Sequence, residues 1–168
     1  MKRILTVVVA PALAVGLLTG GAGMASAEPP IQTEVRARLL PVDAAPDPSA
    51  RGGVKLRTRT RGDSEDLRFH ASFDTDFASA EEAEAAMFAL VVETEGGGTA
   101  TCDLDFDEFD ELLGRAEYNV NLRQRNGELK ENAGTCIGGI PAVVEGNSAH
   151  IEDGGGVIQV EGMFFQKR

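Results

Sequence analysis

The sequence predicts an all-β protein, an antiparallel β-sandwich or flattened barrel of about eight strands with one short helix. Two observations support this fold class. Apolar and polar residues alternate along several short segments, which is the period of a strand with one face in a core. Signals for turns, rich in glycine, proline and asparagine, separate these segments.

Three alternating segments come first and predict a β-meander. They cover residues 34–39, 54–61 and 67–73, with a Pro- and Gly-rich loop after the first segment and a Gly62-Asp63 turn after the second. In each segment the apolar side chains occupy one parity and basic side chains the other. The basic side chains expected on the non-core face are Arg36, Arg38, Lys55, Arg57, Arg59, Arg61 and Arg68.

The remaining elements follow a short helix. Ser79 and Glu82 form a capping box that predicts helix over residues 80–86. Strands are expected after it, and Asn126-Gly127 is a tight-turn signal. These strands are residues 87–95, 99–107, 115–125, 142–145 and 157–165.

The N-terminus has the pattern of a secretory signal peptide. Lys2 and Arg3 precede an uncharged apolar run, and residues 25–27 read Ala-Ser-Ala, an A-x-A cleavage pattern. We therefore expect residues 1–27 to be removed, leaving residues 28–168 as one domain with no membrane span. The product is expected to be secreted, periplasmic or held in the cell envelope.

Two cysteines, Cys102 and Cys136, follow the expected cleavage site. An exported compartment is oxidising, so a Cys102–Cys136 disulfide is the expected state. A metal pair or a reactive thiol is the alternative, but the spacing is not that of a zinc site.

The charge is strongly acidic and unevenly distributed. The formal net charge is −11, and loss of the two basic leader residues makes it more negative. Residues 28–73 hold 8 basic and 7 acidic residues, whereas residues 74–168 hold 6 basic and 20 acidic residues. This balance opposes general binding to nucleic acid, whose phosphates need a cationic surface.

The acidic stretch at residues 103–111 is the most conspicuous motif. It fails as an EF-hand loop that starts at Asp103, because Glu108 stands where that loop needs Gly and Gly114 where it needs Glu. Alternation instead predicts a strand with Cys102, Leu104 and Phe106 inward. Residues 108–114 are expected to form a connection that buries its apolar side chains. The outward carboxylates expected from the strand are Asp103, Asp105 and Asp107.

Two interpretations of these carboxylates stay open. They pair with the basic strands of the first meander, or they bind Ca²⁺ weakly at a site of another type, as extracellular modules do. The candidate calcium ligands are Asp103, Asp105, Asp107, Glu108, Asp110 and Glu111.

No catalytic residue is assigned. The serines lie in no G-x-S-x-G elbow, and carboxylate pairs are too many to single one out. We therefore expect a structural or protein-interaction module without catalytic activity or cofactor, whose partner is an extracellular protein or envelope component. A calcium-dependent binding module is the alternative, and a carboxylate-based hydrolase is the second alternative.

Several segments resemble those of small exported bacterial β-sandwich domains of unknown function. They are residues 37–39 (ARL), the loop 41–48, residues 50–52 (ARG), residues 114–120 (GRAEYNV) and residues 157–164 (VIQVEGMF). The chain is also loosely similar to chordin-type (CHRD) domains, which carry an A-H-I-H stretch where residues 149–152 read A-H-I-E. This resemblance implies a β fold, and it implies no activity and no site residue.

Overall fold

A computed structural model describes residues 29–167 of the chain. The expected signal peptide, residues 1–27, lies outside the described residues. This part of the chain contains ten strands and one helix. In chain order they are β1 (Ile31–Pro41), β2 (Arg51–Arg61), β3 (Ser64–Asp76), α1 (Ala80–Ala85), β4 (Phe88–Glu93), β5 (Thr99–Asp110), β6 (Arg115–Arg125), β7 (Glu128–Ala133), β8 (Thr135–Cys136), β9 (Ser148–Asp153) and β10 (Ile158–Gln166).

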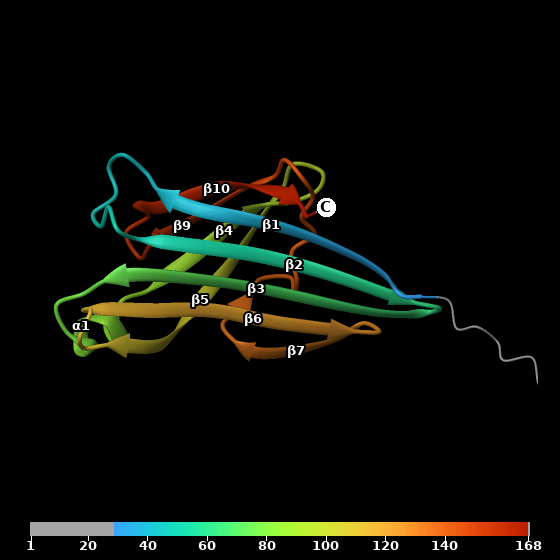
Figure 1. Ribbon diagram of the computed structural model, residues 1–168, viewed down its shortest axis with the longest axis horizontal. Coiled ribbons are helices and arrows are strands. Elements are labelled where there is room, and N and C mark those ends of the chain that lie inside the picture. Colours follow the sequence, from blue (N-terminus) through green and yellow to red (C-terminus); the bar gives the residue numbers. More distant parts are fainter. Residues whose placement is uncertain (1–28, 168) are drawn as a thin grey trace, which may run out of the picture.

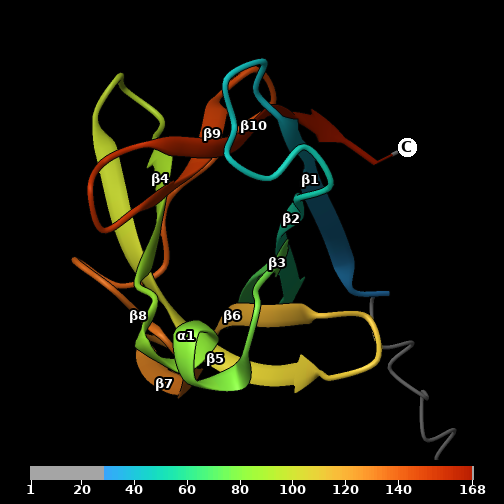
Figure 2. The same cartoon turned by 90° about the vertical axis from the view of Figure 1, so that its left-hand side faces the viewer.

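The strands form a closed antiparallel barrel of eight strands, with β7 and β8 added outside the circuit. The order around the barrel is β6-β3-β2-β1-β10-β9-β4-β5, and pairing of β5 with β6 closes it. Figure 1 shows the long strands side by side, and Figure 2 shows them arranged around the interior when viewed from the α1 end. Of the two expected architectures, the structure is a barrel and not a sandwich.

Strand β5 makes the closure possible because it changes partners along its length. Its first half pairs with β4 and β8, and its second half, from Asp105 to Asp110, pairs with β6. A register shift between Phe106 and Glu108 marks the change. Such a bulge bends a strand and increases its twist, which turns β5 from one side of the barrel to the other.

The interior is filled by the apolar parity of the strands. Leu39, Phe69, Phe73, Tyr118 and Ile151 have no exposed surface. Phe73, Phe77, Phe88, Phe106 and Tyr118 pack together near the α1 end, with ring centroids 4.8–6.3 Å apart. The alternation in the sequence therefore predicted the inward face of the first meander and of β6.

Helix α1 closes one end of the barrel. Ser79 caps it by accepting a hydrogen bond from the backbone N–H of Glu82, as the capping box predicted. Ala83 is fully buried, and its carbonyl accepts a 2.6 Å hydrogen bond from the Tyr118 hydroxyl. Burial raises the pKa of Tyr118 to about 12, so this hydroxyl keeps its proton.

Three expectations about the later chain were wrong. Residues 142–145 form a loop and not a strand. The Val143 side chain of this loop is buried in the core, but the segment pairs with no neighbouring strand in the described part of the chain. Strands β7, β8 and β9 were missed. Leu112 and Leu113 are exposed rather than buried, because β5 continues to Asp110 and only a tight turn separates it from β6.

Candidate functional site

A row of arginines crosses three neighbouring strands on the outer face of the barrel. Arg57 on β2 lies opposite Arg68 on β3, and Arg68 lies opposite Arg123 on β6. Lys130 on β7 extends the row, because it lies opposite Arg123. Like charges directly opposite one another destabilise a sheet. Such a row therefore needs an anion, either from the protein or from a ligand.

Asp66 supplies part of this negative charge from the next row. Its carboxylate accepts hydrogen bonds from Arg123 Nε and Nη2 at 2.9 and 3.0 Å, and from Arg68 Nη2 at 3.3 Å. The hydrogen bond from Arg123 is the main reason why the pKa of Asp66 is below its ordinary value, and burial opposes this shift. The fork geometry holds both guanidinium groups in fixed positions.

Asp66 is flanked by two further arginines that have no carboxylate partner within residues 29–167. Arg59 on β2 and Arg125 on β6 are its cross-strand neighbours, and neither forms an ion pair in the described part of the chain. Arg61 lies opposite Ser64 and is likewise unpaired there.

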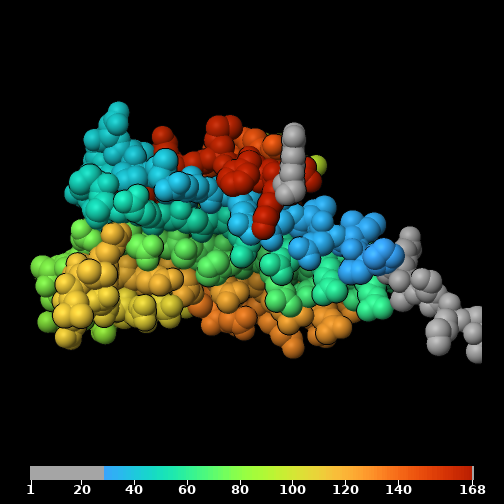
Figure 3. All heavy atoms as spheres, viewed as in Figure 1, coloured from blue at the N-terminus to red at the C-terminus, as the bar shows by residue number. Residues whose placement is uncertain are grey.

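Together these side chains line a hollow of about 350 Å³, which we call the arginine hollow. It contains five guanidinium groups and one carboxylate, in a chain whose formal net charge is −11. Its lining residues are Arg59, Arg61, Ser64, Asp66, Arg68, Arg123 and Arg125. In Figure 3 the strand ends that carry it form the right-hand end of the molecule.

The platform beneath the arginine hollow is held by the turn between β6 and β7. Asn126 has φ 50° and Gly127 φ 85°, the left-handed region in which Asn and Gly are favoured. Asn126 Oδ1 accepts hydrogen bonds from Ser64 Oγ and Glu65 N, and Asn126 N donates to the Glu65 carbonyl. The turn that the sequence predicted therefore joins β6 to the β2–β3 hairpin and fixes the arginine strands relative to one another.

A second anion, which unlike the half-buried Asp66 is buried, stabilises the other end of the arginine row. Glu34 on β1 is 7% exposed, and its carboxylate accepts hydrogen bonds from Arg36 Nε and Arg57 Nε, the latter at 3.3 Å. Burial opposes ionisation of Glu34, but these hydrogen bonds outweigh it and keep its pKa below the ordinary value. Arg36 and Arg57 are thus occupied internally, whereas Arg59, Arg61 and Arg125 face the hollow with no carboxylate partner among residues 29–167.

The carboxylates of the acidic stretch form no ion pairs with these arginines within residues 29–167. Asp103, Asp105 and Asp107 point outward, as predicted, but the ion pairs of the first meander within residues 29–167 go to Glu34 and Asp66. Of the two interpretations of these carboxylates, pairing with the basic strands of the first meander is therefore not seen in the described part of the chain. Asp105 Oδ2 accepts a 2.6 Å hydrogen bond from Gly134 N.

The geometry around the candidate calcium ligands is that of a strand followed by a turn. Asp110 Oδ1 accepts hydrogen bonds from the backbone N–H groups of Leu112 and Leu113, at 2.9 and 3.1 Å. Within the described residues, no three acidic, histidine or cysteine side chains converge as a metal site would require. Calcium binding by Asp103, Asp105, Asp107, Glu108, Asp110 and Glu111 stays a prediction.

The Cys102–Cys136 disulfide is present, as predicted. Cys102 on β5 and Cys136 on β8 are direct cross-strand neighbours, and both are buried. The bond holds the segment after β7 against the part of β5 that pairs with β4.

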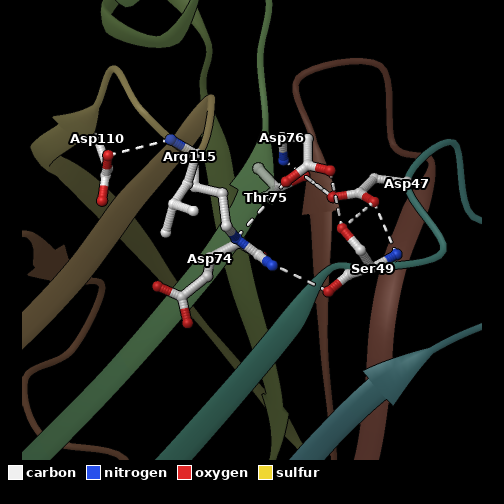
Figure 4. A network of polar contacts seen from close by, with 8 residues as sticks. Asp47, Ser49, Asp74, Thr75, Asp76, Asp110 and Arg115 are labelled. Atoms are coloured by element: carbon white, nitrogen blue, oxygen red, sulfur yellow. Dashed lines mark hydrogen bonds and ion pairs between the residues drawn. The ribbon is translucent and has the colours of Figure 1, made fainter.

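A polar network fixes the opposite end of the barrel (Figure 4). Asp47 accepts hydrogen bonds from Ser49 N and Oγ, Thr75 Oγ1 and Asp76 N, all between 2.7 and 2.9 Å. Burial opposes the ionisation of Asp47, but these bonds keep its pKa below the ordinary value. Arg115 donates to the carbonyls of Ser49 and Asp74, so the network ties the β1–β2 loop to β3 and β6.

The carboxylates beyond this network are crowded. Asp74 on β3, Glu117 on β6 and Glu108 on β5 form a cross-strand row. Burial raises the pKa of Glu117, and the charges of Asp74, Asp107 and Glu108 raise it further. The outer face of the barrel thus has a cationic end and an anionic end.

Sequence reasoning had identified the basic side chains of β2 and β3 as outward-facing, and it considered only the carboxylates of residues 103–111 as their partners. It missed the contribution of Arg123 and Arg125, because β6 is separated from β3 in the sequence by the helix and two strands. The repeated Arg-x-Arg-x-Arg pattern at residues 57–61 was the available signal.

Comparisons of the chain with protein-family models, with curated proteins and with solved structures find no match. None of the helices in residues 29–167 has the length and hydropathy that crossing a membrane requires.

Proposed function

We propose that this protein is an exported, non-catalytic protein-interaction module whose contact surface is the arginine hollow. The hollow would bind an acidic segment of a partner protein outside the cytoplasm. The observation that supports this most strongly is the set of Arg59, Arg61 and Arg125, which point to one hollow without a carboxylate partner in the described part of the chain.

Guanidinium groups suit carboxylates because their planar forks match both oxygens of the anion. In the arginine hollow, Asp66 and Arg123 already form one such forked pair. An incoming carboxylate would find further arginines pre-positioned by the sheet, so less side-chain entropy would be lost on binding than on a flexible surface.

A compact acidic segment fits better than a long polyanion. The carboxylate row at Glu117 lies six residues along β6 from Arg123, which is roughly 20 Å of strand. A polyphosphate or polysaccharide chain that followed the strands would run from the arginines onto these carboxylates. The lining also contains no aromatic side chain on which bases or sugar rings could stack.

The alternatives have less support. A calcium-dependent binding module using residues 103–111 and a carboxylate-based hydrolase both stay predictions of the sequence. The one hydroxyl in the arginine hollow, Ser64 Oγ, donates its hydrogen bond to Asn126 Oδ1, and the Asp66 carboxylate in the same lining accepts from Arg68 and Arg123. The likeness to exported β domains suggests a β fold and no reaction.

The test is the binding of a fluorescently labelled hexaglutamate peptide, followed by anisotropy. The variant Arg59→Glu/Arg125→Glu reverses two charges that have no internal ion pair in the described residues, and circular dichroism confirms that it folds before binding is compared. We expect it to bind the peptide at least about tenfold more weakly than the wild-type protein.

The matched control is Arg38→Glu/Arg51→Glu, which changes the net charge equally but lies outside the arginine hollow. Arg51 and the position opposite Arg38 are at least six residues along β2 from Arg59, which is roughly 20 Å of strand. This control should bind within about twofold of the wild-type protein, because exposed charges beyond a Debye length are screened at 0.15 M salt. Equal weakening in both variants would mean that only net charge matters and would contradict the proposal.

The exported form should begin at Glu28 when its N-terminus is sequenced.

A further inference from the structure

The turn between β5 and β6, residues 110–114, presents two leucines to solvent. Leu112 is 97% exposed and Leu113 is 69% exposed. We call this segment the leucine turn. A single exposed leucine is common, but two adjacent ones at the tip of a tight turn form a small apolar projection.

The leucine turn is held in one shape. Asp110 Oδ1 accepts from the N–H groups of both leucines, and Gly114 N donates to the Asp110 carbonyl at 2.8 Å. Gly114 has φ 67°, and its carbonyl accepts from Phe77 N at 2.8 Å. The projection is thus pre-organised, which reduces the entropy lost when a turn binds to a partner.

The leucine turn is also acidic. Asp110 and Glu111 belong to it and Glu108 precedes it, and none of the three forms an ion pair within residues 29–167. Arg115 follows the turn, but its Nε lies 3.5 Å from Asp76 and its Nη2 donates to backbone carbonyls. An acidic turn with two exposed leucines is therefore available for a partner.

These properties complement those of the arginine hollow. Its guanidinium groups would pair with Asp110 and Glu111, while the aliphatic stems of its arginines would cover the leucines. The leucine turn cannot reach the hollow of its own chain. Arg115 and Arg125 stand at opposite ends of β6, ten residues or roughly 33 Å apart. Figure 1 shows the two ends of β6 at opposite ends of the barrel.

We propose that the partner of the arginine hollow is a second copy of this chain, which inserts its leucine turn in a head-to-tail contact. This inference rests on the proposed function, because it names the acidic segment that the hollow binds. Such a contact joins different surfaces of the two copies, so each added copy offers the same two surfaces again and the assembly can grow.

The test is sedimentation of the purified protein at low ionic strength and at concentrations up to about 1 mM, because so small a contact belongs to the weak class. The weight-average mass should rise with concentration and fall back to that of the monomer in 1 M salt, where the Debye length is about 3 Å. Two variants each remove one surface: Arg59→Glu/Arg125→Glu in the hollow and Glu111→Lys/Leu112→Ser in the turn. Each should be monomeric by itself.

An equimolar mixture of the two variants is the decisive sample. One chain keeps an intact hollow and the other an intact turn, so the mixture should form a complex of two chains that does not grow further. The control Ile137→Ser/Glu145→Lys makes the same chemical changes at other exposed positions and should associate like the wild-type protein. A mixture that stays monomeric, or variants that associate like the wild-type protein, would overturn the head-to-tail contact.

The failure of this inference differs from a failure of the proposed function. If the wild-type protein is monomeric at every concentration but hexaglutamate still binds in a manner that depends on Arg59 and Arg125, the second copy is wrong and the arginine hollow still binds acidic segments. If the peptide does not bind either, both are wrong.

Discussion

Reduction of the Cys102–Cys136 disulfide should remove a large share of the stability of the barrel. The two cysteines are 34 residues apart, and the loop they close contains β6, β7 and the closing half of β5. In the chain-entropy model, a cross-link over a loop of this length stabilises the folded state by roughly 3.8 kcal/mol. For a domain of this size that corresponds to a fall in Tm of roughly 10 °C.

The assay is urea denaturation of the oxidised protein and of the same protein in dithiothreitol. The reduced wild-type protein isolates the cross-link, because dithiothreitol breaks only the S–S bond and leaves a hydrogen on each sulfur. The variant Cys102→Ala/Cys136→Ala should lose at least as much free energy of unfolding, since it also leaves space in the core. A loss below about 1 kcal/mol on reduction would refute the reasoning, because the cross-link would then not constrain the unfolded chain as assumed.

Three further predictions concern stability and pH. Tyr118→Phe should lower the free energy of unfolding by about 1–3 kcal/mol in urea denaturation, because the buried Ala83 carbonyl loses its hydrogen bond, and an unchanged midpoint would contradict this. The pKa values of Glu34 and Asp66 are lowered in the folded state. Their contribution to the free energy of unfolding is therefore present above their ordinary pKa values of 4.5 and 3.8 and is lost as pH falls below them. Between pH 6 and pH 3 the wild-type protein should lose more free energy of unfolding than the variant Glu34→Gln does. Glu117→Gln should raise the free energy of unfolding at pH 7 by up to about 0.5 kcal/mol, because burial and three neighbouring carboxylates disfavour its charge; a destabilised variant would show that the charge is compensated.

The parts of the fold that the sequence predicts are the strands that have one buried face and one solvent-exposed face. The predicted bounds of β6 match the structure, and those of the first meander are right to within a few residues. Alternation of apolar and polar residues indicates both that a segment is a strand and which of its side chains face the core. Strand β7 was missed because nearly all of its side chains are exposed, so it has no alternation to detect. Strand β8 is only two residues long and depends on the disulfide partner.

Bulges and pairing partners are harder to predict. The change of parity after Phe106 looked like the end of a strand, but it is the bulge at which β5 turns toward β6. That bulge decides between sandwich and barrel, and it depends on contacts far away in the sequence.

The arginine hollow could not be predicted from the sequence because it also depends on contacts between residues that are far apart in the chain. Arg68 and Arg123 are direct cross-strand neighbours although they are far apart in the chain, and register across such a distance is set by the packed barrel. The number of carboxylates in residues 103–111 suggested that the arginines would pair with them. The barrel instead places much of the acidic stretch at the other end of the outer face, where Glu108 lies beside Glu117.

The most direct test of the central claim is to observe the arginine side chains while an acidic peptide binds. In protein labelled with ¹⁵N-arginine, the Nε–Hε signals of Arg59, Arg123 and Arg125 should shift on titration with hexaglutamate, whereas those of Arg51 and Arg115 at the anionic end should not. Equal shifts at both ends, or shifts confined to Arg51 and Arg115, would contradict the assignment of the arginine hollow as the binding surface.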